Sequence, residues 1–159
     1  MRNWLSADEL HVVRAFLNGG VRFLIVGGRA VQFHGHLRLA KDSDLFVETS
    51  SENKKRLAAV LKNLGTYVNQ HEFENLCEDR RAKGTVCGYP VEFITAINGV
   101  RFLDAWADGI QTSVEGLAVR VLSKPHLILS KMNTGRPLDA DDVRALQDTP
   151  GYSASMDNK

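Results

Sequence analysis

The chain has 159 residues, 43% of them hydrophobic and 25% charged, with a formal net charge of +1. This length fits one compact domain with a core of its own, and the near-neutral charge provides no global field for nucleic acid or an anionic membrane. The apolar runs are too short to span a bilayer, and no secretory signal opens the chain. We therefore expect a cytoplasmic protein without a membrane partner. Cys77 and Cys87 are then expected to be reduced, and a disulfide between them is the less favoured alternative.

The first elements are marked by their end signals. Ser6 and Glu9 have the spacing of a capping box, and apolar residues at helical spacing follow until Gly19-Gly20 ends the helix. An apolar, β-branched run over 21–26 then predicts a buried strand that ends in a turn at Gly27-Gly28.

The later elements follow from periodicity and turn residues in the same way. The expected helices lie over 29–35, over the residues that follow Ser50 or Ser51, over 103–106, from residue 123 onward and over 140–147. The expected strands lie over 42–48, on either side of a turn at 88–90, over 111–114 and over 117–122. This order predicts an α/β or α+β fold, a short mixed sheet covered by helices. We expect one domain over 1–150, with a core over about 20–122, C-terminal helices over about 123–148 and a disordered tail over 151–159.

Asp42 and Asp44 are the first candidate site residues. Side chains alternate along a strand, so both carboxylates lie on one face while Ser43 lies on the other. Adjacent carboxylates repel, and a bound divalent cation removes the conflict. Mg²⁺ prefers carboxylate and phosphate oxygens.

Gly27 and Gly28 are candidates for phosphate binding. A glycine turn between a strand and a helix exposes backbone N–H groups, and the missing Cβ atoms let a phosphate approach closely. Taken alone, such a turn is more often purely structural, and the same holds for Asp-x-Asp at a strand end.

Glu92 is the candidate for a third carboxylate. It interrupts the apolar run of 90–94, and its neighbours Val91 and Phe93 point to the opposite face. A charge on a buried strand is costly unless it is paired or coordinates a metal. An acid on an exposed strand face is the alternative.

The joint pattern resembles the nucleotidyltransferase superfamily that includes DNA polymerase β, in which a glycine pair is followed by two strand aspartates and a later strand acid. More closely, it is similar to small bacterial nucleotidyltransferases related to abortive-infection and toxin–antitoxin enzymes. The resemblance covers about residues 20–147. The matching residues are Val26, Gly27, Gly28, Ala30, His34, Gly35, Arg38, Lys41, Asp42 and Asp44, and later Lys131, Arg136, Asp139 and Asp142.

This resemblance implies a polymerase-β-like core and a metal-dependent enzyme that moves a nucleoside monophosphate from a nucleoside triphosphate to an acceptor hydroxyl. Asp42, Asp44 and Glu92 would be the catalytic and metal-binding residues, with two Mg²⁺ ions, or Mn²⁺ as an alternative. Gly27, Gly28, Arg38 and Lys131 would bind the nucleotide. RNA such as tRNA, a protein or a small molecule remain open as acceptors, and a cognate toxin or antitoxin is a candidate partner.

Two departures from the family pattern keep a second interpretation open. Ala40 stands where relatives often have threonine, and Ser43 stands where they usually have an apolar residue. Either change could reduce turnover, so the alternative is a nucleotide-binding or partner-binding module of a toxin–antitoxin-like system. A nucleic-acid-binding protein without chemistry is disfavoured by the near-neutral charge.

The remaining charged residues have structural interpretations. His34 and His36 could suggest zinc, but no second ligand pair lies nearby, so we expect His34 to pack on its helix and His36 to be solvated. Arg136, Asp139 and Asp142 are interpreted as a structural brace with a minor nucleotide role. The basic clusters over 54–56 and 80–83 are expected to be solvated faces.

Overall fold

The structure, a computed structural model, describes residues 4–36, 38–40, 42–65, 81–132 and 134–148, with 81–83 described in their backbone only. The predicted tail over 151–159, Lys41, Cys77 and Arg80 lie outside the described residues. The helices are α1 (Ala7–Asn18), α2 (Gly27–Phe33), α3 (Ser51–Asn63), α6 (Phe102–Asp108), α7 (Lys124–Lys131) and α8 (Pro137–Asp148). The strands are β1 (Phe23–Val26), β2 (Ser43–Val47), β3 (Arg81–Val86), β4 (Tyr89–Ile94), β5 (Ile110–Val114) and β6 (Leu117–Val121).

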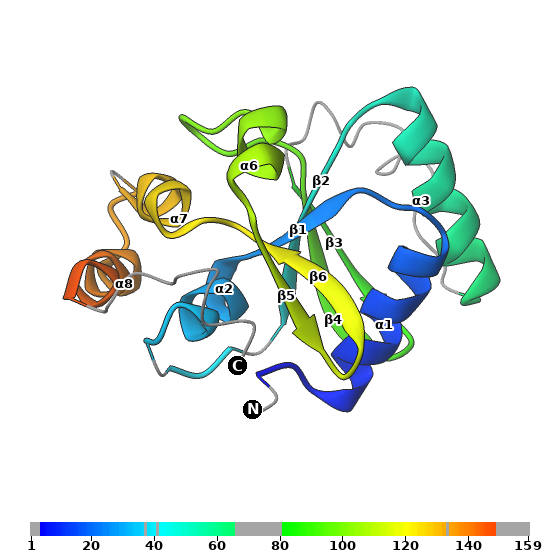
Figure 1. The fold of residues 1–159 in the computed structure, drawn as a ribbon, viewed down its shortest axis with the longest axis horizontal. Helices are drawn as coiled ribbons and strands as arrows, with labels where there is room; N and C mark the ends of the chain where they lie inside the picture. The colour runs from blue at the N-terminus through cyan, green and yellow to red at the C-terminus, as the bar shows by residue number, and fades with distance from the viewer. Residues whose placement is uncertain (1–3, 37, 41, 66–80, 133, 149–159) are drawn as a thin grey trace.

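The six strands form one mixed sheet in the order β3-β4-β2-β1-β6-β5. The pairs β1–β6 and β2–β4 are parallel, whereas β1–β2, β3–β4 and β5–β6 are antiparallel. Figure 1 shows α1 and α3 on one side of the sheet and α2, α7 and α8 on the other. The expected fold class, a short mixed sheet covered by helices with a C-terminal helical element, is confirmed.

The capping box at the start of α1 is present as predicted. The Ser6 hydroxyl accepts a hydrogen bond from the Glu9 backbone N–H, and the Glu9 carboxylate accepts one from the Ser6 N–H. Behind this cap, α1 buries Leu10, Val13 and Phe16 against the sheet. The N-terminal helix is thereby anchored beside the strands that carry the candidate site.

Most element boundaries differ from prediction by one or two residues, and three of the differences bear on the turns and helix starts. The β3–β4 turn lies at Cys87-Gly88, not at 88–90, because both residues have positive φ, 52° and 80°, and such a two-residue turn matches the twist of the strands. Pro90 is accommodated in β4 just before that strand begins to pair with β2.

The helix expected over 29–35 begins already at Gly27 and ends at Phe33. The last helix begins at Pro137, where proline suits a first helical turn.

The C-terminal helices share the core of the sheet. Leu127 in α7 and Leu146 in α8 are both fully buried in the hydrophobic cluster that contains Ile25 and Val121. Within the described part of the chain, no helix has the length and apolar character needed to cross a membrane. Cys87 carries a free, exposed thiol.

Candidate active site

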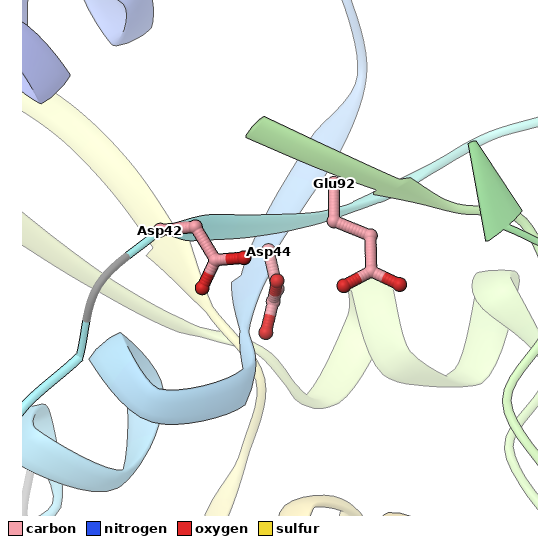
Figure 2. Close-up of side chains that lie close together, drawn as sticks. All are labelled: Asp42, Asp44 and Glu92. Atoms are coloured by element: carbon pink, nitrogen blue, oxygen red, sulfur yellow. The ribbon is translucent and has the colours of Figure 1, made fainter. Parts of the chain in front are cut away.

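Three carboxylates meet where β2 begins beside β4. Asp42 directly precedes β2, Asp44 is its second residue, and Glu92 lies opposite Asp44 on the parallel strand β4. Carboxylate oxygens of the three residues all lie within 4.8 Å of one another. Figure 2 shows the three side chains pointing to the same side of the strands. No other group of three His, Cys, Asp or Glu side chains in the described residues could share a metal ion, so the zinc alternative at His34 and His36 finds no ligand set there.

The alternation of side chains follows the predicted pattern. Ser43, between the two aspartates, is buried on the opposite face, as expected. Its hydroxyl does not simply disturb the packing there, because it donates a hydrogen bond of 2.6 Å to Oε2 of Glu9. On β4, Val91, Glu92 and Phe93 are all buried, and of the three only Glu92 lines the cleft. The departure at Ser43 therefore leaves the arrangement of the carboxylates intact.

The two glycines have different surroundings. Gly27 has a φ of +64°, and a Cβ built on it would lie 2.0 Å from Oδ2 of Asp44. A Cβ on Gly28 would lie 2.9 Å from Cβ of Ala40 and 3.3 Å from the guanidinium nitrogens of Arg38. Gly27 thus makes room for a site carboxylate, and Gly28 makes room for the segment that precedes β2. The small side chain of Ala40 belongs to that close packing.

A cleft of about 540 Å³ opens in front of the carboxylates. All seven residues proposed from the sequence line it: Gly27, Gly28, Arg38, Asp42, Asp44, Glu92 and Lys131. They come from four separate segments of the chain. The lining also includes Arg136 and Asp139. Further polar and apolar residues line it as well: Asn98, Ser130, Thr134, Val26, Ile94, Ala96, Ile97 and Leu138.

The cationic wall of the cleft is organised by two buried aspartates of α8. Asp142, which is fully buried, lies 3.0 Å from Nε of Arg38 and 2.9 Å from Nζ of Lys131. Asp139 lies 3.2 Å from Nζ of Lys131 and 2.7 Å from Nε of Arg136. Two carboxylates therefore hold three guanidinium or ammonium groups, which leaves a surplus of one positive charge facing the cleft.

Burial alone would raise the pKa of Asp139. Hydrogen bonds from Thr134 and Lys131 and the positive charges of Lys131 and Arg136 outweigh that effect, so the pKa lies below its usual value. Asp139 is therefore ionised near neutral pH, and its contacts with Lys131 and Arg136 are ion pairs.

His34 and His36 each contact a protein partner in the described part of the chain. His34 is buried, and its Nε2 lies 2.8 Å from the carbonyl oxygen of Leu122, to which it donates. Burial lowers the pKa of His34, the hydrogen bond to Leu122 opposes this, and nearby Lys124 adds to the lowering. The expected structural role of His34 is thus observed. His36 is only half-buried but lies 3.6 Å from Asp142, so it is not simply solvated.

Two residues of the site region were underestimated from sequence. The pattern predicts a structural brace at Arg136, Asp139 and Asp142, but it does not predict that Asp142 is fully buried and joins α8 to Arg38 and Lys131. Glu9 was interpreted only as a helix cap, although it also reaches Ser43. In both cases the available signal was an acid in an otherwise amphipathic helix, which is usual for a solvated face.

The chain is similar in fold to several solved structures. The lincosamide antibiotic adenylyltransferase LnuA in its lincomycin-bound form has a TM-score of 0.60 at 16% identity, covering 92% of this chain and 99% of that one. ANT(2″)-Ia in complex with adenylyl-2″-tobramycin has a TM-score of 0.55 at 16% identity, covering 86% of this chain and 84% of that one. An antigenic nucleotidyltransferase-like protein from Paracoccidioides brasiliensis has a TM-score of 0.56 at 15% identity, covering 89% and 77%.

At identities this low, the likeness to these structures is one of fold. No curated protein sequence matches the chain. A family model described as "Nucleotidyl transferase of unknown function (DUF2204)" matches residues 6–155. The matched range includes both the sheet with its three carboxylates and the two C-terminal helices.

Proposed function

Because this chain belongs to the nucleotidyl transferase family DUF2204, we propose that it transfers a nucleoside monophosphate from a nucleoside triphosphate to an acceptor hydroxyl. The observation that carries the proposal is the juxtaposition of Asp42, Asp44 and Glu92, whose carboxylate oxygens lie within 4.8 Å of one another at the edge of a cleft with a cationic wall. Acids at one end and cations at the other suit a metal-bound triphosphate.

The donor set fits a hard divalent cation. Asp42, Asp44 and Glu92 offer only oxygen ligands, which is the chemistry that Mg²⁺ prefers, and their spacing allows them to share an ion. We propose two Mg²⁺ ions, with Mn²⁺ as a substitute. When bound, they neutralise charge on the phosphates and lower the pKa of the acceptor hydroxyl.

The proposed reaction is an in-line displacement at the α-phosphorus. The acceptor oxygen forms a bond to this phosphorus, and the bond from the phosphorus to the oxygen bridging to the β-phosphate breaks. Pyrophosphate leaves with that oxygen and its electron pair, and the proton of the acceptor hydroxyl is released to water. Arg38 and Lys131 neutralise the charge of the triphosphate, and Gly27 and Gly28, which line the cleft at the start of α2, offer backbone N–H groups to the phosphates. Catalysis of this kind depends mainly on positioning.

For the acceptor we propose classes of compound rather than a single molecule. LnuA and ANT(2″)-Ia, by name, act on antibiotics, and this favours a small hydroxyl compound as the first acceptor to test. RNA and protein acceptors belong in the same experiment. A toxin or antitoxin partner rests on the sequence resemblance alone and stays a prediction.

Glu92→Gln is the variant that tests this proposal, by separating binding from chemistry. We expect it to retain most of the affinity for triphosphate, because Asp42 and Asp44 remain, but to lose about 10²–10⁴-fold in the rate of transfer. Triphosphate affinity is measured by calorimetry. The rate is measured as pyrophosphate release with Mg²⁺, each of the four nucleoside triphosphates, and a panel of aminoglycosides, lincosamides, tRNA and cell extract.

Glu52→Gln provides the matched control, because Glu52 is an exposed acid on α3 whose change removes the same charge away from the cleft. Its rate should equal that of the wild type. If the wild type binds triphosphate but releases no pyrophosphate with any acceptor, the protein is a binding module and the enzyme proposal fails.

A further inference from the structure

A buried ionic cluster lies on the face of the sheet opposite the candidate metal site. At its centre is Glu9 of α1, which is 1% exposed. Its Oε1 accepts from the Ser6 backbone N–H at 3.0 Å and lies 2.6 Å from a guanidinium nitrogen of Arg29. Its Oε2 accepts from Nε of Arg29 at 2.9 Å and from the Ser43 hydroxyl at 2.6 Å. The carboxylate thus has four donors, and three of them, two from Arg29 and one from Ser43, come from segments that carry site residues.

Arg29 extends the cluster to a third segment of the site. It follows Gly28 in α2, and its guanidinium donates to Oε1 of Gln32 at 3.0 Å and to the Tyr89 hydroxyl at 3.3 Å. Tyr89 begins β4, three residues before Glu92. Burial opposes the charge of Arg29, but the bonds to Tyr89 and Glu9 outweigh burial and raise its pKa. The glycine turn, β2 and β4 are therefore all joined to the Glu9–Arg29 ion pair.

Ser43 connects this cluster to the two aspartates. It is the first residue of β2, and Asp42 lies just outside the paired region of that strand. Because side chains alternate, any rotation of the strand about its axis at Ser43 moves the Asp42 and Asp44 carboxylates in concert. A hydrogen bond that fixes the Ser43 side chain on one face therefore fixes the direction of both carboxylates on the other.

Stability alone does not account for such a cluster. A buried ion pair is often no more stabilising than apolar residues of the same volume. Groups that hold metal-binding side chains in place commonly contribute substantially to metal affinity. We propose that Glu9 and Ser43 are positioning residues, which hold Asp42 and Asp44 at metal-binding spacing through the Glu9–Ser43 hydrogen bond. This inference rests on the proposed function, because it presupposes the metal site.

The test uses Mn²⁺ alone as the probe, with its affinity measured from the electron paramagnetic resonance of the free ion. Ser43→Ala removes only the hydroxyl, and we expect the Mn²⁺ dissociation constant to rise about tenfold. Glu9→Gln should weaken binding at least as much, because it also breaks the ion pair with Arg29. Ser43→Thr keeps a hydroxyl and should restore most of the affinity.

Ser50→Ala is the matched control. Ser50 caps α3 at the other end of β2, so this variant also exchanges a hydroxyl for hydrogen and costs some stability, but away from the cluster. Its melting temperature should fall while its Mn²⁺ affinity stays at the wild-type value. If Glu9→Gln does not fold, the positioning role is tested by comparing the Mn²⁺ affinities of Ser43→Ala and Ser50→Ala.

Wild-type Mn²⁺ affinity in Ser43→Ala would overturn the positioning role and leave the proposed function intact. The same applies if Ser50→Ala weakens Mn²⁺ binding as much as Ser43→Ala does, since the effect would then be one of general stability. If the wild type itself binds no Mn²⁺, the metal site of the proposed function fails, and the positioning inference is overturned with it.

Discussion

At the scale of single residues, the backbone of Gly27 packs directly against the side chain of Asp44. Gly27 combines a positive φ with a backbone position at which a Cβ would fall 2.0 Å from a carboxylate oxygen. A side chain at this position must therefore displace the carboxylate. At Gly28 the atoms in the way belong to Ala40 and Arg38, and φ is not positive there. We thus expect the two glycines to differ in their sensitivity to substitution.

Gly27→Ala should abolish Mn²⁺ binding and transfer while the protein stays folded. The strain of an alanine at positive φ is about 1–2 kcal/mol, which lowers stability only in part, but the new methyl group forces Asp44 away from the other acids. Gly116→Ala is the control, because Gly116 has a φ of +80° and nothing lies within 4 Å of a Cβ built there. In the control we expect only the loss of stability caused by the positive φ, with unchanged Mn²⁺ affinity. Normal Mn²⁺ affinity in Gly27→Ala would contradict the assignment of Asp44 as a ligand.

At the scale of elements, α8 is attached to the rest of the molecule by charge as well as by apolar packing. Asp142 links it to Lys131 of α7 and to Arg38 in the segment before β2. These two cations are also the proposed partners of the triphosphate. The docking of α8 and the shape of the nucleotide site therefore depend on the same carboxylate.

Asp142→Asn should lower the free energy of unfolding by about 3 kcal/mol. This is the lower end of the range for breaking a buried ion pair, because Lys131 keeps Asp139 as a partner. Asp141→Asn changes the neighbouring exposed acid, which pairs with Arg144 on the surface, and should stay within about 0.5 kcal/mol of the wild type. Urea unfolding of both variants makes the comparison. Equal stability of the two would show that the Asp142 brace contributes nothing.

The elements also show how far the sequence alone could lead. The capping box and the alternation around Ser43 depend on neighbours in sequence, and the structure confirms both. The turn expected at Gly27-Gly28 is instead the start of α2. The pairing of β2 with β4, which brings Glu92 opposite Asp44, arises from tertiary packing and was assumed only through the family pattern. The buried partners of Asp142 and Glu9 were missed for the same reason. A helical acid with its partner far away in sequence cannot be distinguished from a solvated one by local pattern.

At the scale of the whole molecule, we propose that residues 1–150 fold as a single unit. The supporting observation is that Leu127 and Leu146, from the two C-terminal helices, are buried in the same cluster as the central strands. The C-terminal helices would then not unfold separately from the sheet. Small domains with one continuous core commonly unfold in a single transition.

Leu146→Ala tests this proposal through a cavity in the last helix. Truncating a fully buried leucine costs about 2–5 kcal/mol, so the melting temperature should fall clearly. The fall in melting temperature should be the same whether unfolding is followed by far-ultraviolet circular dichroism or by tryptophan fluorescence. The fluorescence reports on the rest of the molecule, because Trp4 and Trp106 lie outside α7 and α8. A helical transition that precedes the fluorescence change would instead indicate two independent units.

The hydrogen bond between Ser43 and Glu9 also constrains how the sequence can diverge. It joins positions 34 apart in the chain, both of them buried. An apolar residue in place of Ser43 leaves a buried carboxylate one donor short, at a cost of about 1–3 kcal/mol. That cost disappears when position 9 changes too, so the two positions should be inherited as a pair. Among diverged relatives, glutamate at position 9 should accompany a hydroxyl residue at position 43, and mixed combinations should be rare.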